Sequence, residues 1–308
     1  MAMDNLYKCK ENINKEPLVS VVMSAYNAEK TIGATIKSIL RQSYQKLELI
    51  IVDDASQDQT LSIIKSFPDP RIKLICNPTN LTLGPSLNIA LEAARGEFIA
   101  RQDADDLSLP DRLEKQVKYL LANPEVDVVG SYSYIINGSG TILGGMKTKG
   151  LKHEELILNI SLDVPFIHPT VMAKASWYRK YRYRSYPRSQ DRDLWLRAYQ
   201  HSRFASLPEF IYAYRDPGRI QLKKLFLASG TNLLMRIKHY REYGLPATAV
   251  LIYPLILGGK WTYWSLLALQ GKSVFASVCQ KLPKDAKLQK DQAWIYNCLG
   301  LEAKANPK

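Results

Sequence analysis

The chain has 308 residues, enough to bury the core of one large α/β domain with appendages, or of two smaller domains. Its composition, 46% hydrophobic and 23% charged, excludes a disordered or low-complexity protein, and its four cysteines, without a CxxC pair, indicate neither a zinc site nor a disulfide framework. The net charge of +13 is concentrated in residues 221–308, which contain thirteen Lys or Arg and four Asp or Glu. This basic region favours contact with an anionic membrane over contact with nucleic acid; the alternative is an ordinary solvated surface.

Residues 1–16 form a polar tail without the apolar core that a signal peptide needs, so we expect a cytoplasmic protein. From Leu18 the chain alternates apolar runs with amphipathic stretches. A strand (LVSVVMSAY), a helix (IGATIKSILRQS) and a strand (LELIIV) are followed by a helix (TLSIIKSF), a strand (RIKLIC), a helix (LNIALEAA) and a strand (EFIA). Four strands are therefore predicted before residue 104.

Continuous apolar runs of this kind are typical of a parallel sheet that helices cover on both faces. We predict an α/β fold class, in which residues 17–106 are the nucleotide-binding half of a doubly wound, mostly parallel, Rossmann-like sheet. In such sheets ligands bind beyond the carboxyl ends of the strands. Polar residues follow three of these ends: Tyr26 and Asn27; Asp53 and Asp54; and Asp103, Asp105 and Asp106. The candidate nucleotide-binding residues are Ala25, Tyr26, Asn27, Asp53 and Asp103.

Residues 107–220 are predicted to complete the domain as its acceptor half. A helix should follow Pro110, VDVVGSYSYII and GTILGG should form a hairpin, and PFIHPTVMAK should be a strand interrupted by Pro169. SQDRDLWLRAYQ predicts a helix capped by Ser189, and SRFASLPEFIYAYR predicts the last strand. A boundary near residue 220 should separate this domain from a basic, aromatic-rich, helical C-terminal region, 221–308.

The C-terminal region contains two strongly apolar segments, Ala247–Leu257 and Trp261–Leu269, which Gly258, Gly259 and Lys260 divide. Each is too short to span a bilayer. They predict either an interfacial or re-entrant hairpin at a membrane, or two packed core helices.

Three carboxylates, those of Asp103, Asp105 and Asp106, follow the fourth strand closely enough to repel one another unless a cation lies among them. Carboxylates together with substrate phosphates suit Mg²⁺ or Mn²⁺, which would neutralise a diphosphate. The alternative is a solvated loop whose aspartates cap the next helix. Asp53 and Asp54 could bind a base or ribose or form a turn, and Tyr26 could stack on a base or simply pack.

Asp191 falls in the first turn of the SQDRDLWLRA helix, where the helix dipole should lower its pKa and keep it ionised. An ionised carboxylate can act as a general base toward an acceptor hydroxyl. The alternative is a helix stabiliser, with Asp193 paired to Arg192 or Arg197.

Residues 174–203 hold nine Lys or Arg with interleaved tyrosines and only two Asp. The segment could be a mobile loop that closes over a diphosphate or binds a phosphorylated lipid acceptor, with Arg184 and Arg188 as candidate ligands, or a solvated basic loop. His168 could assist the metal or the acceptor, or be a hydrogen-bonded structural residue.

Several ordered motifs together resemble the family 2 glycosyltransferases, which are inverting enzymes with the GT-A nucleotide-sugar fold. They are VSVVMSAYNAEKTIGATIKSILRQSYQKLELIIVDDASQDQT, LNIALEAARGEFIARQDADDLSLPDRLEKQ, HPTVM and SQDRDLWLR, and the resemblance covers about residues 17–216. Ser24 stands where the family commonly has Pro, and Gln190 where it commonly has Glu. Neither departure removes a carboxylate that the family needs.

The resemblance implies that Asp53 contacts the nucleobase, Asp103 the ribose or the metal and Asp105 the metal, with Asp191 as the base. It implies a nucleotide-sugar donor, most commonly UDP-linked with GDP and dTDP as alternatives, a divalent cation (Mn²⁺ or Mg²⁺), and a saccharide or lipid-linked acceptor. We expect such an enzyme at the inner face of a bacterial plasma membrane, in surface polysaccharide synthesis. The rival hypotheses are a metal-dependent nucleotidyltransferase, which usually needs a glycine-rich phosphate loop that SAYNAEKT lacks, and a catalytically silent relative that binds membrane or partner proteins.

Overall fold

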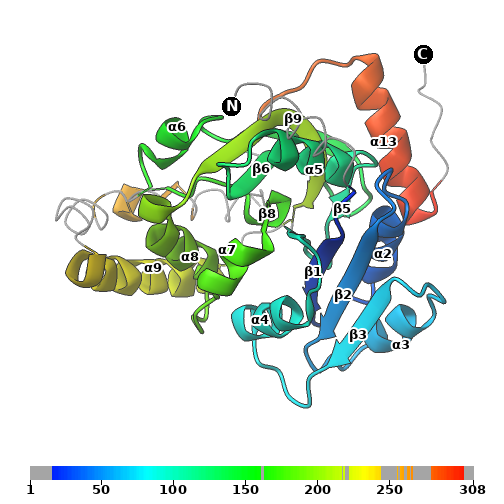
Figure 1. Cartoon of the computed structure of the whole chain (residues 1–308), viewed down its shortest axis with the longest axis horizontal. Coiled ribbons are helices and arrows are strands. Elements are labelled where there is room, and N and C mark those ends of the chain that lie inside the picture. The colour runs from blue at the N-terminus through cyan, green and yellow to red at the C-terminus, as the bar shows by residue number, and fades with distance from the viewer. Residues whose placement is uncertain are drawn as a thin grey trace, which may run out of the picture.

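A computed structural model describes residues 16–160, 163–216, 218, 222–243 and 279–301, with isolated positions between 255 and 265. Nine strands form one sheet in the order β3-β2-β1-β4-β8-β6-β9-β5, with β7 paired to β6 beside this path (Figure 1). The predicted α/β fold is therefore present.

The first four strands are the parallel part of the sheet, as their apolar sequences predict. Alternate side chains of these strands enter opposite cores because a strand repeats every two residues. Val22 and Ile50 pack with helix α4, whereas Val21 and Leu49 pack with helices α2 and α3. These elements are β1 (Val19–Ala25), α2 (Ile32–Leu40), β2 (Leu47–Asp53), α3 (Thr60–Lys65), β3 (Ile72–Cys76), α4 (Leu83–Ala93) and β4 (Phe98–Arg101).

Beyond β4 the sheet is mixed. β8 runs antiparallel to β4 and β6, β6 runs parallel to β9, and β7 forms the predicted hairpin with β6. These elements are β5 (Leu107–Ser108), α5 (Arg112–Ala122), β6 (Val128–Ile136), β7 (Ile142–Met146), α6 (His153–Ile157), η1 (His168–Thr170), β8 (Met172–Lys174), α7 (Ala175–Lys180), α8 (Gln190–Ala198), η2 (Tyr199–His201) and β9 (Phe204–Arg215).

Three local predictions are corrected. The helix expected from Leu87 already begins at Leu83, because Pro85 is tolerated in a first helical turn. The strand expected over PFIHPTVMAK is limited to Met172–Lys174, since the residues around Pro169 form the 3₁₀ turn η1 instead. Ser189 does precede α8, but its backbone is left-handed (φ 59°) and its side chain makes no capping hydrogen bond.

Two helices of the C-terminal region pack on the domain. α9 (Leu222–Tyr243) lies along α8, and α13 (Ala286–Leu299) covers α2 and the edge of the sheet near β5 (Figure 1). On α13, Ile295 is buried in the same cluster as Leu107 and Tyr134. The Trp294 indole also donates a 3.3 Å hydrogen bond to the Ser108 carbonyl. The described end of the chain thus belongs to the same packed body as the sheet.

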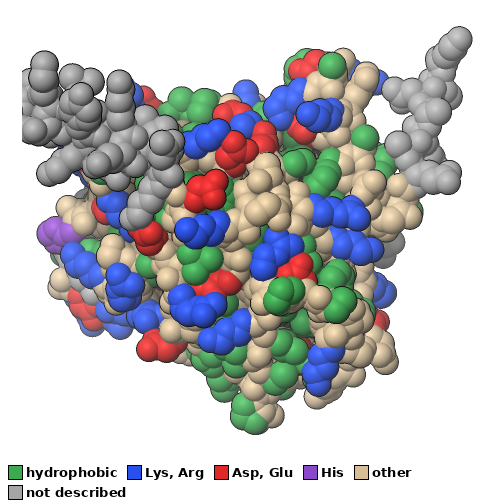
Figure 2. Space-filling model, turned by 45° about the vertical axis from the view of Figure 1, so that its right-hand side comes forward, with side chains coloured by type: hydrophobic (Ala, Val, Ile, Leu, Met, Phe, Trp, Pro, Cys, Tyr) green, Lys and Arg blue, Asp and Glu red, His purple; other side chains and the backbone are tan. Residues whose placement is uncertain are grey.

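The apolar segments Ala247–Leu257 and Trp261–Leu269 lie outside the described residues except for isolated positions, so their role stays a prediction. The described helices include none that is long and apolar enough to cross a membrane. On the face shown in Figure 2, Lys and Arg side chains are interleaved with Asp, Glu and apolar side chains rather than gathered in one block.

Candidate active site

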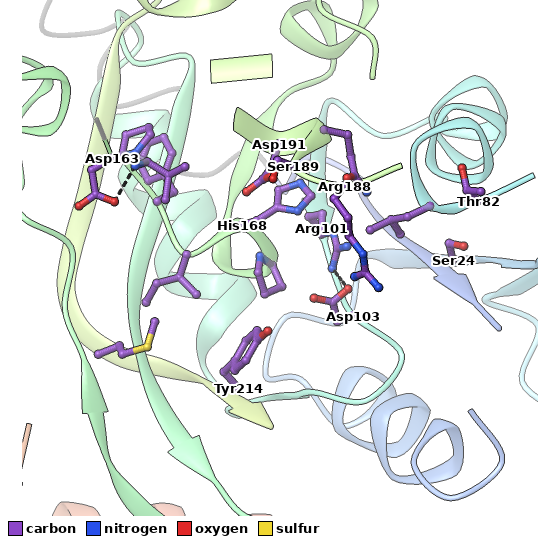
Figure 3. Close-up of a pocket in the computed structure, with 18 of the residues that line it drawn as sticks. Ser24, Thr82, Arg101, Asp103, Asp163, His168, Arg188, Ser189, Asp191 and Tyr214 are labelled. Atoms are coloured by element: carbon purple, nitrogen blue, oxygen red, sulfur yellow. Dashed lines mark hydrogen bonds and ion pairs between the residues drawn. The ribbon is translucent and has the colours of Figure 1, made fainter. Parts of the chain in front are cut away.

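A cavity of about 770 Å³ opens at the carboxyl ends of the parallel strands (Figure 3). One wall comes from the loops after β1, β2 and β3, and the opposite wall from the end of β7, residues 163–169 and residues 187–191. Arg101 and Asp103, at the end of β4, lie between the two walls. The topology therefore brings the predicted strand ends and the start of α8 to one space.

The loops after β1 and β2 hold each other in place. Asn27 has a left-handed backbone (φ 49°), its N–H donates to Ser56 Oγ (3.1 Å), and its Oδ1 accepts from the Gln57 N–H (2.9 Å). These bonds fix Tyr26, which lines the cavity with its ring half exposed, while Ala25 is buried in β1.

The two aspartates after β2 have different surroundings. Asp54 lines the cavity, and its Oδ1 accepts hydrogen bonds from Asn77 Nδ2 (2.7 Å) and from the Leu81 N–H (2.9 Å). Asp53 is only 3% exposed; its Oδ2 accepts from the Ser56 N–H (3.3 Å), but its Oδ1 has no hydrogen-bond partner within the described structure. A buried oxygen left in this state is costly unless a ligand donates to it.

The acidic cluster after β4 brings together one carboxylate oxygen each from Asp103, Asp105 and Asp106, all within 4.8 Å of one another. Asp106 is buried; its two oxygens accept from the Tyr212 hydroxyl (3.0 Å) and from the Arg215 N–H (2.7 Å). The alternative, in which these aspartates cap the next helix, is not observed, because no side chain caps the N-terminus of α5.

Burial, and after it the neighbouring carboxylates, raises the pKa values of Asp105 and Asp106. The side chain of Asp105 reaches solvent, yet desolvation by the surrounding protein and the charge of Asp103 raise its pKa to about 6. Burial, Asp105 and Asp103 raise the pKa of Asp106 well above its ordinary value. Hard oxygen donors that repel one another in this way fit a divalent cation, with Asp103 and Asp105 as its accessible ligands.

Arg101 is a site residue that the motif analysis missed. Its side chain is 1% exposed, lines the cavity and forms an ion pair with Asp103. The sequence signal for Arg101 was a cationic side chain within an apolar strand, two residues before the acidic cluster. Buried Arg112 supports this strand end, because its guanidinium donates to the Arg101 carbonyl (2.7 Å) and to Gln102 Oε1 (3.0 Å).

Asp191 lies in the first turn of α8 and lines the cavity beside His168 (Figure 3). The expectation of a lowered pKa is wrong, because burial outweighs the helix dipole and raises the pKa of Asp191 above its ordinary value. A carboxyl group with a raised pKa is the stronger proton acceptor once it is ionised.

His168 lines the same wall, and its Nε2 shares a 2.8 Å hydrogen bond with the Tyr183 hydroxyl. Burial and the charge of Arg101 hold the pKa of His168 well below its ordinary value. The imidazole is therefore neutral, so it can accept or donate a hydrogen bond but adds no positive charge to the cavity.

The basic segment 174–203 is largely paired with acidic residues. Ion pairs join Arg182 to Glu92, Arg197 to Asp193 and Arg203 to Glu154. Arg184 points away from the cavity lining, toward Asp193 (3.5 Å) and Glu242 (3.7 Å). Within this segment Arg188 is the cation that lines the cavity, on the side of Arg101 and Asp103 (Figure 3).

Comparison with known proteins places these features in a family. The sequence model described as glycosyl transferase family 2 matches residues 20–244. The chain is 40% identical over 246 residues to EpsE of Bacillus subtilis (strain 168), named as a glycosyltransferase, with 76% of this chain and 86% of EpsE covered. It is also 42% identical over 122 residues (40% of this chain, 48% of the relative) to WfgD of Escherichia coli, named as UDP-Glc:alpha-D-GlcNAc-diphosphoundecaprenol beta-1,3-glucosyltransferase.

Among solved structures, the mannosyltransferase PcManGT from Pyrobaculum calidifontis, in complex with GDP-Man and Mn²⁺, superposes with a TM-score of 0.58. The sequence identity is 20%, and the match covers 96% of this chain and 92% of PcManGT. At this identity the likeness bears on the fold alone, and it confirms the predicted GT-A architecture.

Proposed function

Since the chain belongs to glycosyl transferase family 2 and is a glycosyltransferase, we propose that it is an inverting enzyme of bacterial cell-surface polysaccharide synthesis. It transfers a sugar from a UDP-sugar to a hydroxyl group of a saccharide or lipid-linked acceptor. The observation that carries the proposal is that Asp103, at the end of β4, and Asp191, at the start of α8, line one cavity. A single space can thus present a cation-binding carboxylate beside the donor diphosphate and a proton acceptor to the attacking hydroxyl.

Donor binding is assigned to the ends of β1 and β2. The buried Oδ1 of Asp53 lacks a partner among the described residues, and a nucleobase N–H, such as N3–H of uracil, would supply one. The half-exposed ring of Tyr26 is available to stack on the base. The UDP-Glc donor in the name of WfgD supports UDP, while GDP-Man in PcManGT keeps GDP among the donors to be tested.

Asp103 and Asp105 are the residues that would hold the cation. Bound there, Mn²⁺ or Mg²⁺ would neutralise charge on the diphosphate leaving group. Arg188 reaches the same part of the cavity and adds a positive charge, which favours phosphate oxygens. The Mn²⁺ ion in PcManGT supports a metal of this kind.

Asp191 is the proposed general base. It takes the proton of the acceptor hydroxyl as the hydroxyl oxygen attacks the anomeric carbon from the face opposite the diphosphate. One displacement inverts the anomeric centre, so no covalent intermediate is needed. His168 and Arg101 line the space beside Asp191 and limit the orientations that the acceptor can adopt.

A membrane-associated acceptor fits two observations. The relative WfgD is named for a diphosphoundecaprenol-linked substrate, and the C-terminal region of this chain is strongly basic. We therefore include peripheral contact with an anionic membrane, at its cytoplasmic face, in the proposal. Membership of the family sets aside the nucleotidyltransferase hypothesis, and turnover of a donor distinguishes an active enzyme from a silent relative.

The test is release of nucleoside diphosphate from a panel of UDP-, GDP- and dTDP-sugars, with membrane extract as the acceptor source and Mn²⁺, Mg²⁺ or EDTA. We expect wild type to release UDP only with a metal, and Asp105→Ala and Asp191→Asn to release little. Glu125→Gln, a change at an exposed carboxylate in the turn that follows α5, serves as the matched control and should behave as wild type. Metal-dependent donor binding without release under any condition would favour a silent binder.

A further inference from the structure

Asp193, two residues after the proposed base, is the centre of a buried polar cluster that joins three parts of the chain. It is 0% exposed. Its Oδ1 lies 3.0 Å from Nε2 of His239 and 3.5 Å from Nη1 of Arg184, and its Oδ2 accepts a 2.8 Å hydrogen bond from Nε of Arg197. His239 comes from α9 and is also 0% exposed.

Asp191 and Asp193 point to different sides of α8. Residues two apart on an α-helix are separated by about 200° around its axis. Asp191 lines the cavity, whereas Asp193 bonds to His239 of α9. The two helices α8 and α9 lie side by side in Figure 1. The cluster therefore anchors the side of α8 that faces α9, and the proposed base lies on the opposite side of the same helical turn.

The same cluster fixes the loop that leads into α8. Arg197, held by Asp193, donates a 2.6 Å hydrogen bond to the carbonyl of Arg182, and Arg184 lies against Asp193 directly. The loop then reaches Arg188 and ends in the left-handed Ser189. A non-glycine residue keeps such a conformation only where its surroundings enforce it.

We propose that His239 and Asp193 are positioning residues for transfer, through which α9 sets the placement of Asp191 in the cavity. The inference rests on the proposed role of Asp191 as base. A buried carboxylate that loses one of its partners is left undercompensated, so the first turn of α8 shifts without the hydrogen bond from His239. The residues assigned to the nucleobase, Tyr26 and Asp53, belong to the ends of β1 and β2 rather than to α8, so we expect donor binding to change little.

The first experiment compares His239→Leu with His239→Gln, which keeps a side-chain N–H. We expect His239→Leu to lower kcat by about 10- to 100-fold, the scale of a misplacement near 1 Å. His239→Gln should recover most of that loss. The dissociation constant for UDP with Mn²⁺, measured by calorimetry, should change little in either variant, which also verifies that both fold. Leu234→Gln, a change at a 69% exposed position of the same helix, is the matched control and should keep the wild-type kcat.

The second experiment repeats His239→Leu in an Asp191→Asn background. With the base removed, its placement no longer matters, so His239→Leu should change the residual rate by less than about twofold. An equal loss in both backgrounds would mean that His239 acts only on general stability, and an unchanged kcat in His239→Leu would overturn the proposal. If Asp191→Asn itself leaves turnover intact, the proposed base is wrong, and that result is separate from a failure of the positioning role.

Discussion

The two halves of the domain hold their candidate site residues in different ways. In residues 17–106, the predicted nucleotide-binding or donor half, Asn27 bonds to Ser56 and Gln57, so the loops after β1 and β2 are tied to each other. In residues 107–220, the predicted acceptor half, the helix that carries Asp191 is anchored by His239, which lies in the C-terminal region. The difference teaches that the loops after β1 and β2 support each other, whereas the helix that carries Asp191 depends on α9.

Removal of the proposed base should give the largest effect. Asp191→Asn should lower kcat by about 10²- to 10⁴-fold, the range for a general base, with donor affinity unchanged. Its raised pKa predicts the direction of the pH profile. Because the base must be ionised, kcat of wild type should fall as the pH drops through the pKa of Asp191, which lies above its ordinary value. Steady-state kinetics across pH with UDP-binding calorimetry checks this, and a normal kcat in the variant would remove Asp191 from the mechanism.

The next largest effect should follow from a change in the buried cluster around Asp193, between α8 and α9. Burial alone would raise the pKa of Asp193, but the hydrogen bond from His239 and the charges of Arg197 and Arg184 lower it overall. Asp193→Asn should cost about 3–5 kcal/mol of unfolding free energy at pH 7, because it leaves buried partners without their charge.

The sign of the pH dependence follows from that lowered pKa. The contribution of Asp193 is complete above the unfolded pKa, about 3.9, and is lost as the pH falls through the lower folded value. The stability gap between wild type and Asp193→Asn should therefore shrink in acid. Urea unfolding of both proteins between pH 7 and pH 3 measures it, and a gap that widens in acid would contradict this assignment.

A smaller loss of stability should follow from a change in α13, beyond the boundary expected near residue 220. Ile295 is fully buried, so Ile295→Ala should cost about 2–4 kcal/mol and lower the melting temperature of the whole chain in one transition. Ile50→Ala in β2 is the comparison within the donor half. If Ile295→Ala instead melts a separate, minor transition, α13 is not part of the same folding unit.

The smallest effects on stability should come from two loop residues that share a left-handed backbone conformation. Ser189 and Asn27 both have positive φ, but the Asn27 side chain bonds to a neighbouring loop, whereas the Ser189 side chain makes no capping hydrogen bond to α8. Ser189→Gly should stabilise by up to about 1 kcal/mol, because glycine adopts this region freely. Asn27→Gly should instead destabilise by about 1 kcal/mol through the lost hydrogen bond. Thermal unfolding of the two variants measures these changes in stability. Changes of the same sign in both variants would contradict the predicted difference between the two loops.

The sequence predicts the donor half better than the acceptor half for physical reasons. Continuous apolar runs define β1, β2 and β4, and strand ends of a parallel sheet must share an edge, so the position of the acidic cluster followed from local pattern. In contrast, the ion pair of Arg101 with Asp103 could not be derived from the apolar pattern of its strand.

The contacts in the acceptor half depend on pairings across long stretches of sequence. The bond between Asp193 and His239 and that between Tyr134 and Asp291 of α13 carry no local signal. The pKa of Asp191 was predicted in the wrong direction because the helix dipole is visible in a sequence and burial is not.

The most direct test of the central claim is the stereochemistry of transfer. The product made from a UDP-α-sugar and its acceptor would be isolated, and the anomeric proton of the new linkage examined by NMR. Attack opposite the diphosphate, assisted by Asp191, predicts a β linkage. An α linkage would show retention and would contradict a single displacement with Asp191 as its base.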